Sequence, residues 1–223
     1  MALNLLMLGP PGAGKGTQAE RFARQRGIPK ISTGDILREA VHDKTEIGAR
    51  AKAIMDRGEL VSDEVMIGIV RERLERPDAV GGFVLDGFPR TVAQAAALDA
   101  IMSQRDPLIV VDIVVPEDEL MRRLGTRSIC RLCGTGAAVG SGVGAACLKC
   151  GGRLVQRTDD NQAVVLERLK VYHRQSEPLV EYYRVRPTFR SIDGAQPPDR
   201  VAADLVAAIE AAGNGAVRQG VQG

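Results

Sequence analysis

The segment GPPGAGKGT, residues 9–17, follows a short apolar run near the start of the chain and constrains the fold more than any other feature. Glycines at this spacing let backbone N–H groups converge on phosphate oxygens without clashes from Cβ atoms. Helix formers follow Thr17, and the N-terminus of a helix favours anions. The pattern predicts a phosphate-binding loop in which Lys15 carries a mobile positive charge. A glycine-rich turn without a ligand is the alternative, which the lysine and its context disfavour.

Apolar runs alternate with helical patterns along the rest of the chain. The runs at 3–8 and 108–115 are apolar almost throughout, as in strands buried on both faces of a sheet. This alternation predicts an α/β fold with a doubly wound parallel sheet of the P-loop NTPase type. Ser62 is expected to cap the helix that follows it. We expect strands at 3–8, 82–86, 108–115 and 189–194, helices at 18–26, 36–41, 45–57, 63–76, 91–102, 116–124, 160–172, 178–186 and 198–211, and a loose tail at 213–223.

Composition narrows the classes of function. Lys and Arg number 30 and Asp and Glu number 28, so the net charge of +2 gives no whole-chain signal for nucleic-acid or membrane binding. Aromatic residues make up only 3%, which disfavours a stacking platform for single-stranded nucleic acid. The chain has no run of about 18 apolar residues and no basic signal-peptide region at its start, so we expect a cytoplasmic protein without a membrane span.

Four cysteines occur as two pairs, Cys130-x-x-Cys133 and Cys147-x-x-Cys150, within a Gly- and Ala-rich stretch that has little to pack. Two such knuckles fit a tetrahedral zinc site. Because the protein fills all four positions, the site would be structural and would hold together an insertion without a core of its own. Iron, redox-active dithiols and reduced cysteines without metal are the alternatives, and spacing and compartment favour zinc.

The phosphate loop resembles that of adenylate kinases rather than that of GTPases or motors. Four later segments resemble the same family in the same order: ISTGD at 31–35, LDGFPRT at 85–91, QRTDD at 156–160 and YHRQ at 172–175. The likeness covers residues 3 to about 210. It implies the reaction ATP + AMP ⇌ 2 ADP with magnesium, and a long-lid member that binds zinc. It also implies a core of residues 1–31, 62–125 and 159–223, a helical AMP-binding insert at 32–61 and a lid at 126–158.

Transfer of a phosphoryl group between two nucleotides gathers many negative charges, so cations with directional donors are needed more than a general base. The resemblance implies catalytic roles for Lys15, Arg90, Arg127, Arg157 and Arg168. Asp86 ends a buried strand beside the phosphate loop, where a carboxylate can hold the water ligands of magnesium; an Asp that only caps a turn is the alternative. Asp159 and Asp160 would orient the donor ribose or pair with the arginines. His42 and His173 are expected to be structural.

The resemblance also assigns the two nucleotide sites. Arg123 would stack on the donor adenine, while Thr33 and Gln94 would contact the acceptor adenine, to which Gln94 can offer both a donor and an acceptor. The ATP side would comprise Gly12, Ala13, Gly14, Lys15, Gly16, Thr17, Arg123 and Arg127. The AMP side would comprise Thr33, Arg38, Glu59, Leu60, Val61, Gly87, Arg90, Gln94, Arg157 and Arg168.

Three alternatives stay open from the sequence. A UMP/CMP kinase would share most motifs, although those enzymes usually have a short lid. GTP could replace ATP as the donor. A zinc-ribbon nucleic-acid module predicts a basic, aromatic insert, whereas residues 134–148 contain no aromatic residue, Arg or Lys. We therefore expect the adenine nucleotides ATP, AMP and ADP as partners, neither nucleic acid nor membrane, and a monomer.

Overall fold

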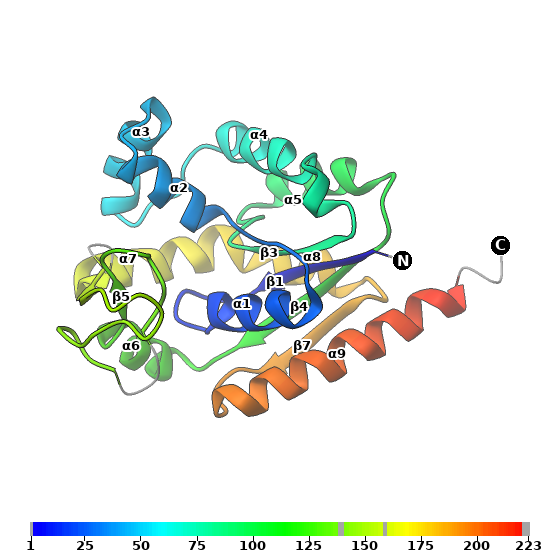
Figure 1. Cartoon of the computed structure of the whole chain (residues 1–223). Helices are drawn as coiled ribbons and strands as arrows, with labels where there is room; N and C mark the ends of the chain where they lie inside the picture. The colour runs from blue at the N-terminus through cyan, green and yellow to red at the C-terminus, as the bar shows by residue number, and fades with distance from the viewer. Residues whose placement is uncertain (1, 138–140, 158–159, 220–223) are drawn as a thin grey trace.

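A sheet of five parallel strands lies at the centre of the computed structural model, which describes residues 2–137, 141–157 and 160–219 (Figure 1). The strand order is β2-β3-β1-β4-β7, so the first strand of the chain lies in the middle. This arrangement confirms the predicted α/β class and its parallel sheet. The strands are β1 (Leu3–Leu8), β2 (Lys30–Ser32), β3 (Gly82–Asp86), β4 (Leu108–Val114) and β7 (Phe189–Asp193).

Helices connect the strands and cover both faces of the sheet (Figure 1). Several begin where the sequence supplies a side-chain cap: Thr45 Oγ1 accepts a hydrogen bond from Gly48 N at 3.1 Å, and Asn161 Oδ1 accepts one from Val164 N at 3.1 Å. The helices are α1 (Lys15–Arg26), α2 (Thr33–His42), α3 (Glu46–Asp56), α4 (Asp63–Leu74), α5 (Val92–Met102), α6 (Glu117–Gly125), α7 (Gln162–Val171), α8 (Pro178–Arg184) and α9 (Pro198–Gln219), with a 3-10 turn at Pro77–Ala79 and a π-helical turn at Tyr172–Ser176.

Successive residues of β1 pack into two different cores. Leu6 and Leu8 lie in a cluster with side chains of α4, α5 and α8, whereas Leu5 and Met7 lie in one with α1, α6, α7 and α9. Side chains alternate across a strand, so a strand covered on both faces must be apolar at every position. This explains the unbroken apolar runs in the sequence.

Three local predictions were wrong or incomplete. The strand β2 was not predicted, because it is only three residues long and leads directly into α2. The last helix continues to Gln219, where a loose tail was predicted from Gly213 onward. Ser62 does precede α4, but its side chain makes no capping hydrogen bond.

A small separate sheet forms the base of the cysteine-bearing insert. Its strands β5 (Ser128–Cys130) and β6 (Leu154–Gln156) are antiparallel, with Ser128 opposite Gln156. None of the helices in the described ranges combines the length and apolar character needed to cross a membrane.

The carboxyl ends of the parallel strands meet at one edge of the sheet. The phosphate loop follows β1, α2 follows β2, residues 87–91 follow β3, and α6 follows β4. Ligands of open parallel sheets bind at this edge, where the loops converge. The fold therefore brings the sequence motifs together although they lie far apart in the chain.

The packing of α2 against α3 yields a test of how residues 32–61, the predicted AMP-binding insert, hold together. A Cβ atom on Gly48 would lie 2.0 Å from the carbonyl oxygen of Ala40, so Gly48→Ala must push the two helices apart. We expect it to destabilise this region by about 1–3 kcal/mol, seen as a lower melting temperature in circular dichroism. Gly68→Ala in α4, where a Cβ meets no atom within 4 Å, should instead stabilise the helix by about 0.5–1 kcal/mol. Equal melting temperatures for the two variants would contradict this account.

Candidate functional site

The phosphate loop wraps around the end of the Lys15 side chain. Lys15 is the first residue of α1, and its Nζ donates hydrogen bonds to the carbonyl oxygens of Gly9 at 2.7 Å and Pro10 at 2.8 Å. Gly14 immediately precedes the helix with φ of 90°, a left-handed conformation that favours glycine. The loop thus holds an ammonium group at a helix N-terminus, where an anion binds favourably.

Burial and neighbouring cations lower the pKa values of the basic groups in the site. The pKa of Lys15 falls to about 8, mainly because of burial and further because Arg90, Arg168 and Arg127 lie nearby, while Asp86 opposes the shift. Burial also lowers the pKa of Arg90 to about 10, with Arg168 contributing, and that of Arg127 to about 10, with Arg157 contributing. So many cations within reach of one another create a place that a polyanion would stabilise.

Asp86 lies beside the loop at the carboxyl end of β3. Gly16 stands where the generic phosphate loop has serine or threonine, and a Cβ at this position would lie in tight contact with Asp86 Oδ2, at 3.2 Å. A carboxylate here can accept hydrogen bonds from the waters of a magnesium ion, and the donor set therefore fits that metal.

Three arginines of the predicted site surround the buried carboxylate of Asp160. Arg168 Nη1 lies 2.9 Å from Asp160 Oδ1, while Arg127 Nε and Arg157 Nε lie 3.8 and 3.9 Å from Oδ2. Charge pairing of this kind is expected where a carboxylate has no exposed side-chain surface. Of the two roles considered for Asp160, the structure supports pairing with the arginines. The other acidic candidate, Asp159, lies outside the described residues, as does Thr158 of the same motif.

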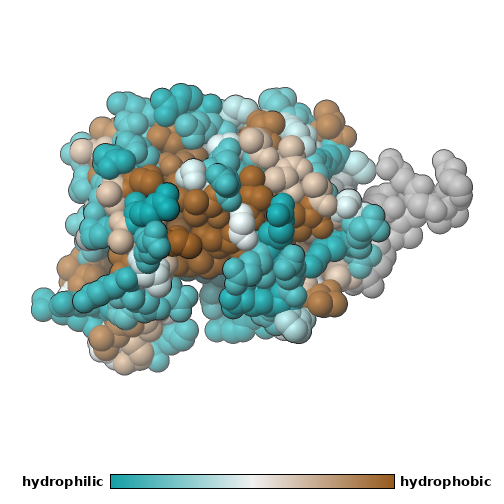
Figure 2. All heavy atoms as spheres, turned by 90° about the horizontal axis from the view of Figure 1, so that it is seen from above, coloured by the Kyte–Doolittle hydropathy of each residue, from teal (hydrophilic) through white to brown (hydrophobic). Residues whose placement is uncertain are grey.

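All ten residues predicted for the acceptor side line one cavity. Gly34, Leu37, Met55, Gly58 and Met66 complete its wall, and the sequence reasoning did not single them out; the only signal for them was their place in or next to the predicted motifs. From above, the side on which α2 to α5 lie in Figure 1, hydrophobic side chains gather at the centre of the face between hydrophilic margins (Figure 2). The lining is Thr33, Gly34, Leu37, Arg38, Met55, Gly58, Glu59, Leu60, Val61, Met66, Gly87, Arg90, Gln94, Arg157 and Arg168.

Two arginines mark the charged end of this cavity. The Arg90 Nε donates to Gly87 O at 2.8 Å, and the Arg38 guanidinium pairs with Asp35. Burial raises the pKa of Asp35, but the charges of Arg38 and Lys30 outweigh it and hold the pKa at about 2. The Asp35 carboxylate therefore stays ionised and keeps Arg38 in place over the physiological pH range.

Thr33 and Gln94 lie beside Arg90 in this cavity, because Thr33 and Arg90 donate to the same carbonyl oxygen and Gln94 accepts from Arg90 N. Thr33 Oγ1 donates to Gly87 O at 2.8 Å. Gln94 is 1% exposed, and both ends of its amide have protein partners, Arg90 N and Asp63 Oδ1. Asp63 lies outside the motifs of the sequence, so no sequence signal pointed to this contact.

The phosphate loop residues 12–17, Arg123 and Arg127 do not line that cavity. Arg123 spans from α6 to the end of β7, because its Nε donates to Glu119 Oε1 at 2.7 Å and its Nη2 donates to Gly194 O at 2.9 Å. The residues predicted for the donor side therefore lie outside this cavity. The two predicted sites are linked by Arg90 and Arg168, which line the cavity and also lower the pKa of Lys15.

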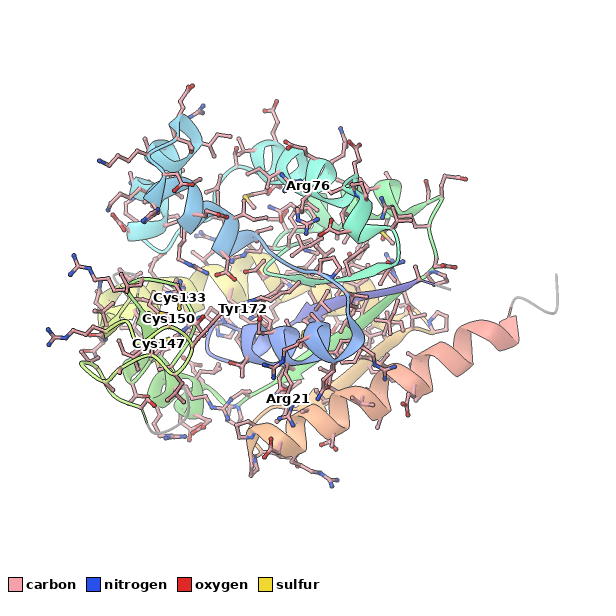
Figure 3. The ribbon with its side chains drawn as sticks, viewed as in Figure 1. Arg21, Arg76, Cys133, Cys147, Cys150 and Tyr172 are labelled. Carbon is pink, nitrogen blue, oxygen red and sulfur yellow. The ribbon has the colours of Figure 1, made fainter. Side chains whose placement is uncertain are left out.

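The four cysteines gather in the insert, and Figure 3 shows Cys133, Cys147 and Cys150 close together. All four Sγ atoms lie within 4.8 Å of one another; the Cys130–Cys150 pair is 3.4 Å apart and the Cys133–Cys147 pair 3.7 Å. Zinc bound tetrahedrally at about 2.3 Å from each sulfur would put the sulfurs about 3.8 Å apart. The donor set therefore fits a structural metal ion.

Comparisons with known proteins agree with this geometry. A family model described as adenylate kinase matches residues 7–188. The adenylate kinase of Archaeoglobus fulgidus is 50% identical over 216 residues, which cover 93% of this chain and 98% of that protein. The adenylate kinase of Geobacter sp. strain M21 is 50% identical over 214 residues, with coverage of 94% and 100%, and that of Rhizobium etli is 46% identical over 214 residues, with coverage of 92% and 98%. This chain therefore belongs to the adenylate kinase family of enzymes.

Proposed function

We propose that this protein transfers the γ-phosphoryl group of ATP directly to AMP and so interconverts ATP + AMP with two ADP. The observation that carries the proposal is the closeness of two cations from different sites. Lys15 belongs to the phosphate loop and Arg90 to the acceptor cavity, yet the charge of Arg90 lowers the pKa of Lys15. Two phosphate chains bound to these cations would meet end to end.

The acceptor nucleotide would occupy the cavity lined by apolar side chains such as Leu37 and Met66 and by a few convergent polar groups, a lining typical of small-molecule sites. Arg38 and Arg90 would bind its phosphate, since guanidinium groups match phosphate oxygens with two hydrogen bonds. Thr33 and Gln94 would contact the base, together with the backbone of residues 59–61.

The donor would lie along the phosphate loop. Backbone N–H groups of residues 12–17 and the Lys15 ammonium would bind its phosphates, Arg127 would contact the phosphates and Arg123 the adenine. Magnesium, when bound with ATP, supplies charge neutralisation at the phosphates, and Asp86 would hold its water ligands.

In the reaction a phosphate oxygen of AMP forms the new bond to the γ-phosphorus while the bond to the bridging oxygen of ADP breaks. The attacking oxygen is already ionised near neutral pH, so no side chain has to remove a proton. Arg127, Arg157 and Arg168 would stabilise the charge that spreads over the transferring group. Residues 32–61 and 126–158 would close over a core of 1–31, 62–125 and 159–223 and exclude water, which would otherwise accept the phosphoryl group.

The four cysteines would bind a structural zinc ion. The insert between β5 and β6 packs only a few apolar side chains, chiefly Leu154 against the two buried cysteines. A metal that crosslinks two knuckles can replace the missing core. Its role would be to hold the insert that carries Arg127 and Arg157 at its base.

A coupled assay with purified protein tests the proposal. With ATP as donor, AMP should be phosphorylated with a higher kcat/KM than UMP, CMP or GMP. Lys15→Met should lower kcat by orders of magnitude, because the ammonium group that would stabilise the negative charge of the transferring group is lost. The circular dichroism spectrum should stay unchanged. Preference for UMP or CMP would overturn the assignment of AMP. Near-normal turnover of the Lys15→Met variant would overturn the role of Lys15.

The low pKa of Lys15 predicts proton uptake when a nucleotide triphosphate binds. In the free protein the pKa is about 8, so at higher pH most molecules have lost the Lys15 proton; the bound phosphates raise the pKa and the proton returns. With a non-hydrolysable ATP analogue, uptake by Lys15 should rise from about 0.2 proton at pH 7.5 to about 0.8 at pH 8.5. Calorimetry in two buffers of different ionisation enthalpy measures this quantity. Lys15→Met should abolish the rise, and an equal rise in both proteins would contradict the prediction.

Removal of the metal should lower the thermal stability of the protein more than its catalytic activity. We expect one zinc ion per chain by elemental analysis. After chelation, and with magnesium restored for the assay, the melting temperature should fall by several degrees while ADP formation at mild temperature is largely kept. Cys147→Ser should behave like the chelated protein, and added zinc should restore only the wild type. Immediate loss of activity at an unchanged melting temperature would instead indicate a catalytic metal.

A further inference from the structure

The side-chain amide of Gln94 is held at both ends by groups that demand opposite roles. Its Oε1 accepts a hydrogen bond from Arg90 N at 2.7 Å, and its Nε2 donates one to Asp63 Oδ1 at 2.7 Å. A backbone N–H can only donate, and an ionised carboxylate can only accept. A half-turn of the amide would set N–H against N–H and oxygen against oxygen. The two contacts together therefore allow one orientation.

Asp63 is itself oriented by a further hydrogen bond. Thr91 Oγ1 donates to Asp63 Oδ2 at 2.9 Å, which leaves Oδ1 facing Gln94. Thr91 also caps α5, because its Oγ1 accepts from Gln94 N at 3.2 Å. Asp63 stands at the start of α4, directly after residues 59–61, which line the acceptor cavity. The contact thus ties the α4 side of the cavity to the loop that carries Arg90.

The fixed amide presents a fixed pattern to the cavity. After its two protein contacts, Gln94 keeps one N–H and one oxygen lone pair for a ligand. Gln94 lines the cavity and is 1% exposed, so water offers little compensation for a mismatched group. Adenine carries an amino donor beside a ring-nitrogen acceptor, whereas hypoxanthine carries a carbonyl acceptor beside an N–H donor. An amide that could rotate would serve both bases, but an amide held in one orientation serves one.

We propose that Asp63 is a specificity-determining positioning residue, which fixes the Gln94 amide and so makes the acceptor cavity select a 6-amino purine over a 6-oxo purine. The proposal rests on the proposed function, because it takes this cavity as the acceptor site. Asp63 acts through Gln94 and need not touch the nucleotide. The selectivity would arise from which end of one buried amide donates and which end accepts, and not from the shape of the cavity alone.

The decisive variant is Asp63→Asn. Asn is nearly isosteric and can bond to Gln94 and Thr91 with its own amide in either orientation, so it keeps the packing but no longer penalises a half-turn of the Gln94 amide. Arg90 N is then the one remaining contact of the two that opposes the half-turn. With ATP as donor, we expect the ratio of kcat/KM for AMP to kcat/KM for inosine 5′-monophosphate to fall about tenfold. The fall should come mainly from KM for the acceptor, with kcat for AMP and KM for ATP changed less than about threefold. Asp63→Ala should lower the ratio at least as far.

Glu64→Gln supplies the matched control. Glu64 is the next residue, is exposed, and carries the same charge at the same helix start, so it reproduces any loss of helix-dipole stabilisation. Its AMP to inosine monophosphate ratio should equal that of the wild type. An unchanged ratio in Asp63→Asn, or an equal fall in Glu64→Gln, would overturn the proposal. Failure of the wild type to phosphorylate AMP would overturn the proposed function instead, so the two failures are distinguishable.

Discussion

The accumulation of buried positive charge at one edge of the sheet is the constraint on which the rest of the structure depends. Lys15, Arg90 and Arg127 all have lowered pKa values because burial removes water and other cations lie near. Such a cluster raises the free energy of the protein without ligand, and anionic phosphates relieve it. Among the described residues, Asp86 and Asp160 lie close to these cations and oppose the lowering of their pKa values. Bound phosphates would add further negative charge to this cluster.

Sheet topology makes this clustering possible. Parallel strands send all their carboxyl ends to one edge, so loops from distant parts of the chain converge there. The register brings Asp86 opposite Met7, within two residues of the loop that contains Lys15. Helices on both faces fix the strands through two cores that share β1. This scaffold determines where each of the clustered charged groups lies.

Much of the fold and of the site could be predicted from the sequence wherever a short motif determines the local structure. The phosphate loop has a glycine pattern with one known use, and the apolar runs of β1 and β4 reveal strands buried on both faces. The ten residues that the family resemblance implied for the acceptor side do line one cavity. The strand β2 was missed because three residues carry no periodicity. The contact between Asp63 and Gln94 joins residues 31 positions apart, and no local pattern encodes such a pair.

The two-stranded ribbon under the insert has a consequence for how the chain can vary. Arg127 directly precedes β5 and Arg157 directly follows β6, and the pairing of Ser128 with Gln156 sets these two arginines side by side near Asp160. Their separation is defined at the base of the ribbon, while the knuckles and the turn lie beyond it. Residues can thus be added or deleted at the far end without altering the spacing of the guanidinium groups. The insert is free to diverge in length and metal content while the spacing of its two basal arginines is preserved.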